Sequence, residues 1–260
     1  MLHFQECGQN QLALTRQFQT VLCEMVLEYF EFLDRFGHGR IFQFGKKDIK
    51  PEPANLVKNY FVCFLVEEGI QGENMRKPSE VTGDRALMIY TLHLTESMGL
   101  MSDVKLQQLL FLCELQMLGK GLKGLHFEFV RYPYGAFSKD VDNDLLFLRR
   151  KERLENFDVT EQAQRVVKLV DQIMKDPDVN QQVMDIIRAV VEKYGPMDTS
   201  AIMSSVEVVE LSPADTPEQK LAIRDISFHT IMLVPSRIET TGAITLSPEQ
   251  VKNLNVAMGY

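Results

Sequence analysis

Tyr132 and Tyr134 are the side chains in this sequence best placed for recognition chemistry. They flank Pro133, which fixes its own backbone and biases the preceding residue toward an extended conformation. Gly135 follows and permits a positive φ. The run therefore predicts a sharp, rigid corner that holds two aromatic rings. Such rings make good anchors in protein interfaces, although an ordinary structural turn packed on a neighbouring helix would use the same residues.

The strongest basic cluster of the chain comprises Arg149, Arg150, Lys151 and Arg153. Such cations can bind the phosphates of a nucleic acid or an acidic surface of a protein partner. They also suit the C-terminal end of a helix, where the backbone dipole is negative. The sequence leaves these three interpretations open.

A helix is predicted over residues 138–148, between the two groups of candidates, with Ser138 as its N-cap. Its outward face would carry Lys139 and Asn143. Three carboxylates share that face: Asp140, Asp142 and, at its margin, Asp144. Carboxylates repel a phosphate backbone, whose binding depends on cations. This face therefore favours a protein partner over the major groove of DNA.

No catalytic, cofactor or metal motif is found in the sequence. The glycine-rich run 119–124 lacks the spacing and the Lys-Ser/Thr pair of a phosphate-binding loop. The histidines are scattered, without HxxxH or HExxH spacing: His3, His38, His93, His126 and His229. We therefore predict no catalytic residues, no metal and no cofactor, and a hydrolase or nuclease is the weakest functional hypothesis.

The composition indicates an acidic globular protein. The 260 residues carry a net charge of −8, which argues against generic nucleic-acid binding. The cysteines lie far apart and lack a CxxC pair, which favours buried free thiols in a reducing compartment: Cys7, Cys23, Cys63 and Cys113. The first residues do not resemble a secretory signal, and the longest apolar run, 60–66, is too short to span a bilayer. These features predict a cytoplasmic protein.

Apolar residues recur at helical spacing through most of the chain. Helices are predicted over residues 9–36, 54–68, 83–98, 104–118, 160–175, 179–194, 199–207 and 248–258. Short strands are predicted within residues 40–45, 125–130, 156–159, 227–234 and 238–246. The helix over 104–118 is apolar on almost all sides and is expected at the centre of the fold. The predicted fold class is mainly α (α+β), helical with a few short strands.

Three segments together resemble a prokaryotic family: residues 105–112, 127–140 and 144–148. They are similar to the YwgA-like proteins, which are related in pattern to the Panacea domain of SocA-type antitoxins. The similarity covers about residues 84–195; the usual Gly-Pro is Gly135-Ala136 here, with Pro133 two positions before the glycine. The resemblance implies a winged-helix-like core and roles in protein neutralisation, adaptor work or DNA binding, without catalytic residues.

The polar run 71–78 contains glycine and proline and predicts a linker. We therefore expect an N-terminal helical unit over residues 1–75 and a winged-helix-like domain over residues 76–210. A C-terminal strand-helix extension would then occupy residues 211–260.

The expected function is that of a non-catalytic regulatory or interaction protein, antitoxin-like or adaptor-like. Its partner would be a protein, either toxin-like or a subunit of an assembly. The alternatives are a DNA-binding transcriptional regulator and a subunit of a nucleic-acid-processing or defence assembly, and a homodimer is a further option. The residues predicted to contact the partner or DNA are Tyr132, Tyr134, Lys139, Asn143, Arg149, Arg150, Lys151 and Arg153.

Overall fold

The computed structural model describes residues 62–63, 76–173, 178–213, 216 and 218–260. All of them belong to one compact unit that spans residues 57–260. The predicted helix over 9–36 and the predicted strand within 40–45 lie outside the described residues. The predicted helix over 54–68 is wrong at the two positions that are described, because Val62–Cys63 forms strand β1 and pairs in parallel with a strand near residue 212. Long-range pairing of this kind overrides a local helical pattern.

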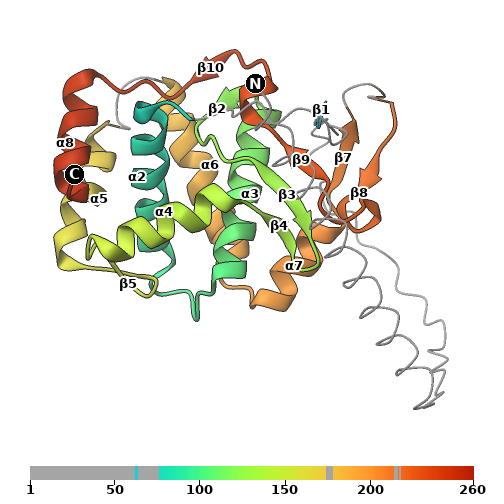
Figure 1. Ribbon diagram of the computed structural model, residues 1–260, viewed down its shortest axis with the longest axis horizontal. Helices are drawn as coiled ribbons and strands as arrows, with labels where there is room; N and C mark the ends of the chain where they lie inside the picture. Colours follow the sequence, from blue (N-terminus) through green and yellow to red (C-terminus); the bar gives the residue numbers. More distant parts are fainter. Residues whose placement is uncertain (1–61, 64–75, 174–177, 214–215, 217) are drawn as a thin grey trace, which may run out of the picture. The chain divides into compact units, whose positions relative to one another are not determined.

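The described residues are mainly helical, which confirms the predicted fold class. The α-helices are α2 (Pro78–Thr95), α3 (Asp103–Gly119), α4 (Lys139–Arg150), α5 (Gln164–Ile173), α6 (Asp178–Tyr194), α7 (Thr199–Glu207) and α8 (Pro248–Met258). Short 3-10 turns are η1 (Glu161–Ala163), η2 (Ile223–Asp225) and η3 (Pro235–Arg237). In Figure 1, α4 crosses in front of the more upright α2.

The strands are short and form four small sheets among the described residues. They are β1 (Val62–Cys63), β2 (Leu122–Lys123), β3 (Phe129–Tyr132), β4 (Gly135–Phe137), β5 (Leu154–Glu155), β6 (Asp158–Val159), β7 (Glu210–Pro213), β8 (Leu221–Ala222), β9 (Ile231–Leu233) and β10 (Gly242–Ala243). The sheet of most interest has the order β4-β3-β9, and β3 runs antiparallel to both neighbours.

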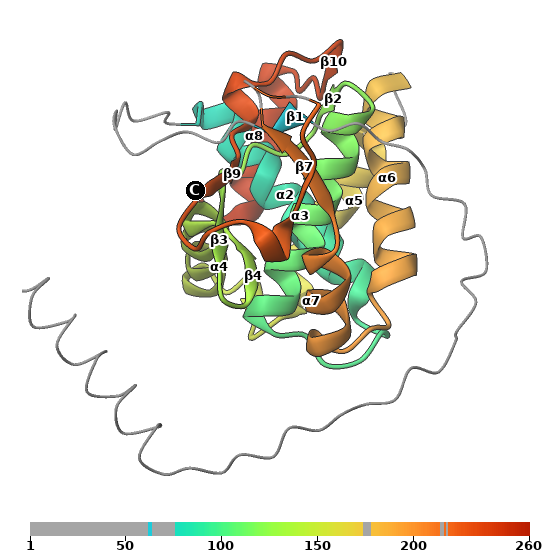
Figure 2. The same cartoon turned by 90° about the vertical axis from the view of Figure 1, so that its right-hand side faces the viewer.

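Helix α3 lies at the centre, as its apolar character predicts. Its N-cap Ser102 accepts a hydrogen bond from the backbone N–H of Lys105, and Leu109, Leu110 and Phe111 are fully buried. It packs against α6, α7 and β4, and Figure 2 shows it between the β4-β3-β9 sheet and α6. Cys113 is a buried free thiol, as expected, and burial raises its pKa.

Two adjacent glutamines of α3 hold strand β4 and the residue that follows it. The side-chain amide of Gln108 donates to the Ala136 carbonyl at 2.9 Å and accepts from the Ala136 N–H at 3.0 Å. Gln107 does the same to Ser138, at 3.1 Å and 2.9 Å. Because β4 is an edge strand, these amides satisfy backbone groups that no neighbouring strand pairs.

The close approach of α3 also explains the glycine at the corner. Gly135 has φ +108°, and a Cβ at this position would clash with the side-chain oxygen of Gln108. Ser138 stands at the N-cap of α4 as predicted, but its hydroxyl makes no hydrogen bond to the helix. Its backbone, held by Gln107, is what fixes the start of the helix.

The C-terminal residues join the same unit. Strand β9 pairs with β3, and β10 pairs with β2. Helix α8 begins with a capping box between Ser247 and Gln250 and packs against α2 and α5. The predicted division at residues 75 and 210 stays a prediction, and the first of its three parts lies almost wholly outside the described residues. Within the described parts of the chain, no helix combines the length and the apolar character needed to cross a bilayer.

Replacing Gln108 by leucine is expected to destabilise the fold by about 2–4 kcal/mol, since two buried backbone groups of Ala136 lose their partners. The free energy of unfolding in urea measures the loss. The matched control is Gln182→Leu on the exposed face of α6, which should stay within about 0.5 kcal/mol of the unchanged protein. Equal effects of the two substitutions would contradict the role given to Gln108.

Candidate functional site

The predicted tyrosines belong to a compact group of rings formed by the β3–β4 hairpin and the residues before β9, here called the aromatic cluster: Tyr132, Tyr134, Phe137 and His229. The ring centre of Tyr132 lies 5.6 Å from Tyr134, 4.9 Å from Phe137 and 5.0 Å from His229. The rings of Tyr134 and Phe137 meet edge to face at 6.2 Å. Three of the side chains are half-buried and His229 is exposed, so the rings support one another and remain open to solvent.

The backbone beneath these rings is held firmly. Arg131, next to Tyr132, is buried, and its Nε donates to the carbonyl of Ile223 at 3.0 Å. The Arg131 backbone donates to Thr230 at 2.8 Å and accepts from His229 at 2.7 Å. His229 itself has φ +66°, a conformation that non-glycine residues adopt only when the surroundings demand it. Sequence reasoning missed Arg131, although strand alternation places it opposite the outward Tyr132.

The pKa of Tyr134 is raised, first by burial and then by the neighbouring Tyr132 and Asp142. Its hydroxyl therefore stays protonated at neutral pH and can donate a hydrogen bond at the edge of an otherwise apolar surface. Flat rings with a polar end are suited to contacts with protein.

Helix α4 presents Lys139 and Asn143 to solvent, as predicted. The placement of Asp144 on this outward face is wrong. Asp144 is buried and accepts from Arg76 at 2.8 Å and from Arg85 at 2.7 Å, both through charged hydrogen bonds. The sequence pattern could not reveal this inward carboxylate, because its partners precede it by about 60 residues or more.

The basic cluster is partly committed to structural contacts. Arg149 donates to the Asn156 carbonyl at 2.9 Å, with its guanidinium 4.8 Å from the Phe157 ring centre. Arg153 donates to the Ala257 carbonyl at 2.7 Å and so fastens the end of α8. Arg150 and Lys151 are exposed.

The aromatic and basic candidates are not brought together. The first group lies before the N-terminal end of α4 and the second lies at its C-terminal end. The helical residues 139–148 separate the two groups, which corresponds to about 15 Å.

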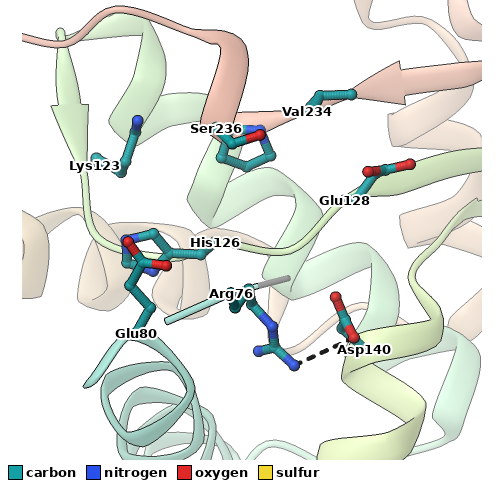
Figure 3. Close-up of a pocket in the computed structure, with 9 residues that line it drawn as sticks. Arg76, Glu80, Lys123, His126, Glu128, Asp140, Val234 and Ser236 are labelled. Carbon is teal, nitrogen blue, oxygen red and sulfur yellow. Dashed lines mark ion pairs between the residues drawn. The ribbon is translucent and has the colours of Figure 1, made fainter. Parts of the chain in front are cut away.

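A second feature, which sequence reasoning missed, is a small polar pocket of about 100 Å³. Its lining is mostly charged: Arg76, Glu80, Lys123, His126, Glu128, Asp140, Val234, Pro235 and Ser236. Figure 3 places Glu80 and His126 on one side and Glu128 and Asp140 on the other. These residues come from distant parts of the chain, so no local sequence motif predicts the pocket. We call it the polar pocket.

The floor of the polar pocket is a buried network of charges. Arg76 lies 2.9 Å from Asp84, 2.8 Å from Asp144 and 3.4 Å from Asp140. The Nδ1 atom of His126 lies 2.9 Å from the other oxygen of Asp84. Burial raises the pKa of Asp144 even though two arginines counteract it. For Arg76, burial lowers the pKa, but the aspartates more than compensate and the net change is a rise.

Glu114 of α3 lies behind this network and has no exposed surface. Neither of its carboxyl oxygens has a hydrogen bond in the structure, although the Phe127 amide faces them. Burial, and then the charge of Asp84, hold the pKa of Glu114 well above its usual range. An uncharged acid at this depth is the expected state, because a buried carboxylate without partners is costly. Across the described segments, no group of three or more His, Cys, Asp or Glu side chains is arranged to hold a metal ion.

Comparisons of the chain with family models, with curated proteins and with solved structures find no match. The resemblance to the YwgA-like and Panacea proteins therefore stays a prediction, and so do the contact residues inferred from the sequence.

Replacing Glu114 by glutamine should remove a pH dependence of stability. A raised pKa means that the folded state binds a proton that the unfolded state releases above about pH 4.5. The unchanged protein should then lose stability as pH rises from that value toward the raised folded pKa, by at most about 1.4 kcal/mol per pH unit from this group. Glu114→Gln has no carboxyl group at this position and should not show this loss. The free energy of unfolding in urea of the variant, relative to that of the unchanged protein, should therefore increase as pH rises.

The control for this measurement is Glu155→Gln, which changes an exposed carboxylate on β5. Parallel pH profiles for the unchanged protein, the control and Glu114→Gln would show that Glu114 is ionised in the folded state, against the expectation.

Proposed function

We propose that this chain is a non-catalytic interaction protein of regulatory type, antitoxin-like or adaptor-like. Its aromatic cluster binds a protein partner, either toxin-like or a subunit of an assembly. The observation that supports the proposal best is the cluster itself, with neighbouring ring centres 4.9–6.2 Å apart on a braced hairpin. Pre-ordered rings lose little conformational entropy on binding, and aromatic residues dominate the binding energy of protein interfaces.

Several observations favour protein over DNA as the partner. Lys139 and Asn143 share the outer side of α4 with Asp140 and Asp142, whose charges would repel phosphates. Arg149 and Arg153, two of the four predicted basic contacts, already bind carbonyl groups of this chain. The net charge of −8 points the same way.

The family resemblance supports the antitoxin-like or adaptor-like part of the proposal. The segments that carry the resemblance include Gln107 and Gln108 as well as the corner near Gly135, and these parts touch in the folded chain. A motif whose separate segments meet in this way behaves as one structural unit. The winged-helix-like description belongs to the proposal too, with the short hairpin β5–β6 following α4 as its candidate wing.

The proposal is tested by comparing proteins retained from a native lysate by the full chain and by the double variant Tyr132→Ala/Tyr134→Ala. We expect a partner that the unchanged chain retains and the double variant loses at least tenfold, since two anchors of about 1–2 kcal/mol each are removed. The control is Leu100→Ala, which removes the most exposed large apolar side chain outside the cluster. It should retain the same partner.

Equal retention by all three forms would refute the proposal. So would steeply salt-dependent binding to duplex DNA, measured by fluorescence anisotropy, if Arg150→Ala/Lys151→Ala abolished it and the tyrosine substitutions did not. That outcome would favour the DNA-binding regulator. Thermal unfolding of each variant establishes that it is folded.

A further inference from the structure

We propose that the polar pocket binds the guanidinium group of an arginine side chain that the protein partner inserts beside the aromatic cluster. The inference rests on the proposed function and specifies the chemistry of the partner. It also rests on the size of the pocket, the balance of charge around it and its position next to the start of strand β3.

The size restricts the occupant. A volume of about 100 Å³ is well below the roughly 300–1,000 Å³ of pockets that hold cofactors or drug-sized ligands. A nucleotide does not fit in such a space. The end of one side chain or a few water molecules does, at about 30 Å³ for each water.

The charges determine the sign of the occupant. Three carboxylates line the pocket, against the two cations Arg76 and Lys123. Arg76 is already surrounded by Asp84, Asp140 and Asp144, and the ammonium of Lys123 donates to the Ile238 carbonyl at 3.2 Å. Arg76 is therefore unavailable to an anion without giving up contacts within the chain, and one of the three donors of Lys123 is occupied. Of the three carboxylates, Asp140 contacts Arg76. Glu80 accepts from the Lys77 N–H, whereas Glu128 has no such contact with the described residues and is open to an incoming cation.

Glu128 supplies the acceptor. This half-buried carboxylate makes no ion pair or hydrogen bond with any other part of the chain that the structure describes. Burial raises its pKa, and of the charged groups that act on it the exposed Arg237 lowers the pKa and Asp140 raises it. A partly desolvated carboxylate without a hydrogen-bonded counter-ion gains from a charge-assisted hydrogen bond. Glu128 and Asp140 lie on the same side of the pocket (Figure 3).

A guanidinium suits these acceptors better than an ammonium does. It offers five N–H donors in a flat fork and can bind carboxylates through two parallel hydrogen bonds. It also gives up its hydration more readily than the compact ammonium of lysine, which matters in a pocket that has room for few waters.

Strand β3 connects the pocket with the aromatic cluster. Along β3, Phe129 and Arg131 are buried, whereas Val130 and Tyr132 are half-buried and form the outer face. Glu128 continues this alternation at the pocket end, and Tyr132 belongs to the cluster at the other end. At about 3.3 Å per residue, some 13 Å separate them, so an extended partner segment reaches both with an arginine and an apolar residue about four positions apart.

The first experiment titrates N-acetyl-arginine methylamide into the full-length protein and follows backbone amide signals by two-dimensional NMR. We expect saturable shifts at residues 126–128 and 140, with millimolar affinity. The neutral citrulline analogue should cause none. Glu128→Gln should weaken binding of the arginine analogue about tenfold, since a charge-assisted hydrogen bond is lost. Glu155→Gln, an exposed carboxylate on β5, should leave the affinity unchanged.

The second experiment separates a partner's arginine from a free small guanidine. Glu128→Gln should reduce retention of the protein partner in the lysate comparison, and Glu155→Gln should not. If the arginine analogue binds but the Glu128→Gln variant retains as much of the protein partner as the unchanged chain does, the assignment to a partner's arginine is overturned.

Other outcomes distinguish the two proposals. Equal binding of the citrulline analogue would overturn the cation assignment, and so would shifts at the same amides with inorganic phosphate instead of the arginine analogue. The proposed interaction function would still hold in either case if Tyr132→Ala/Tyr134→Ala loses the partner. Retention that depends on Glu128 but not on the two tyrosines would support the pocket and refute the role of the aromatic cluster.

Discussion

The side-chain amides of Gln107 and Gln108 are the constraint on which the rest of the described structure depends. They bind the backbone of Ala136 and Ser138 on both the donor and the acceptor side, and so replace a missing neighbour strand at the edge of the sheet. These four hydrogen bonds hold the β3–β4 hairpin against helix α3. The same hydrogen bonds determine the directions of the tyrosines and the start of α4, because both lie next to Ala136 and Ser138.

A second constraint comes from the buried charges between α2 and α4. Asp144 lies between Arg76 and Arg85, and Asp84 joins Arg76 to His126. Buried ion pairs contribute little net stability, but a broken one is costly, so such a network specifies one arrangement of its helices over others. Here it sets the angle at which α4 crosses α2 and leaves a small pocket above the network. The raised pKa of Glu114 favours its uncharged form, which would keep a further negative charge out of this region.

These two constraints meet on strand β3. One end of the strand carries Tyr132 within the aromatic cluster, and the other leads to Glu128 in the polar pocket. The strand is held from below by Phe129, whose ring meets Phe111 of α3 edge to face at 5.2 Å. This surface has the aromatic cluster at one end and the carboxylate of Glu128 at the other. It is suited to a partner that carries an apolar side chain and a basic side chain at a matching distance. At the far end of α4, Arg149 and Arg153 bind backbone carbonyls of neighbouring elements, whereas Arg150 and Lys151 are exposed.

The sequence by itself determined the helical class, the central apolar helix, the helix over 248–258 and the tyrosine corner, because each depends on periodicity or on residues within a few positions of one another. It could not place Asp144, whose polar character and position suggested the outer face of α4 until two distant arginines were brought against it. The helical pattern over 54–68 also predicted helix for Val62–Cys63, which is strand because these residues pair with a strand about 150 positions away in the chain. The polar pocket was decided by tertiary structure alone: its charges are far apart in the chain, and Coulomb interactions depend on separation in space.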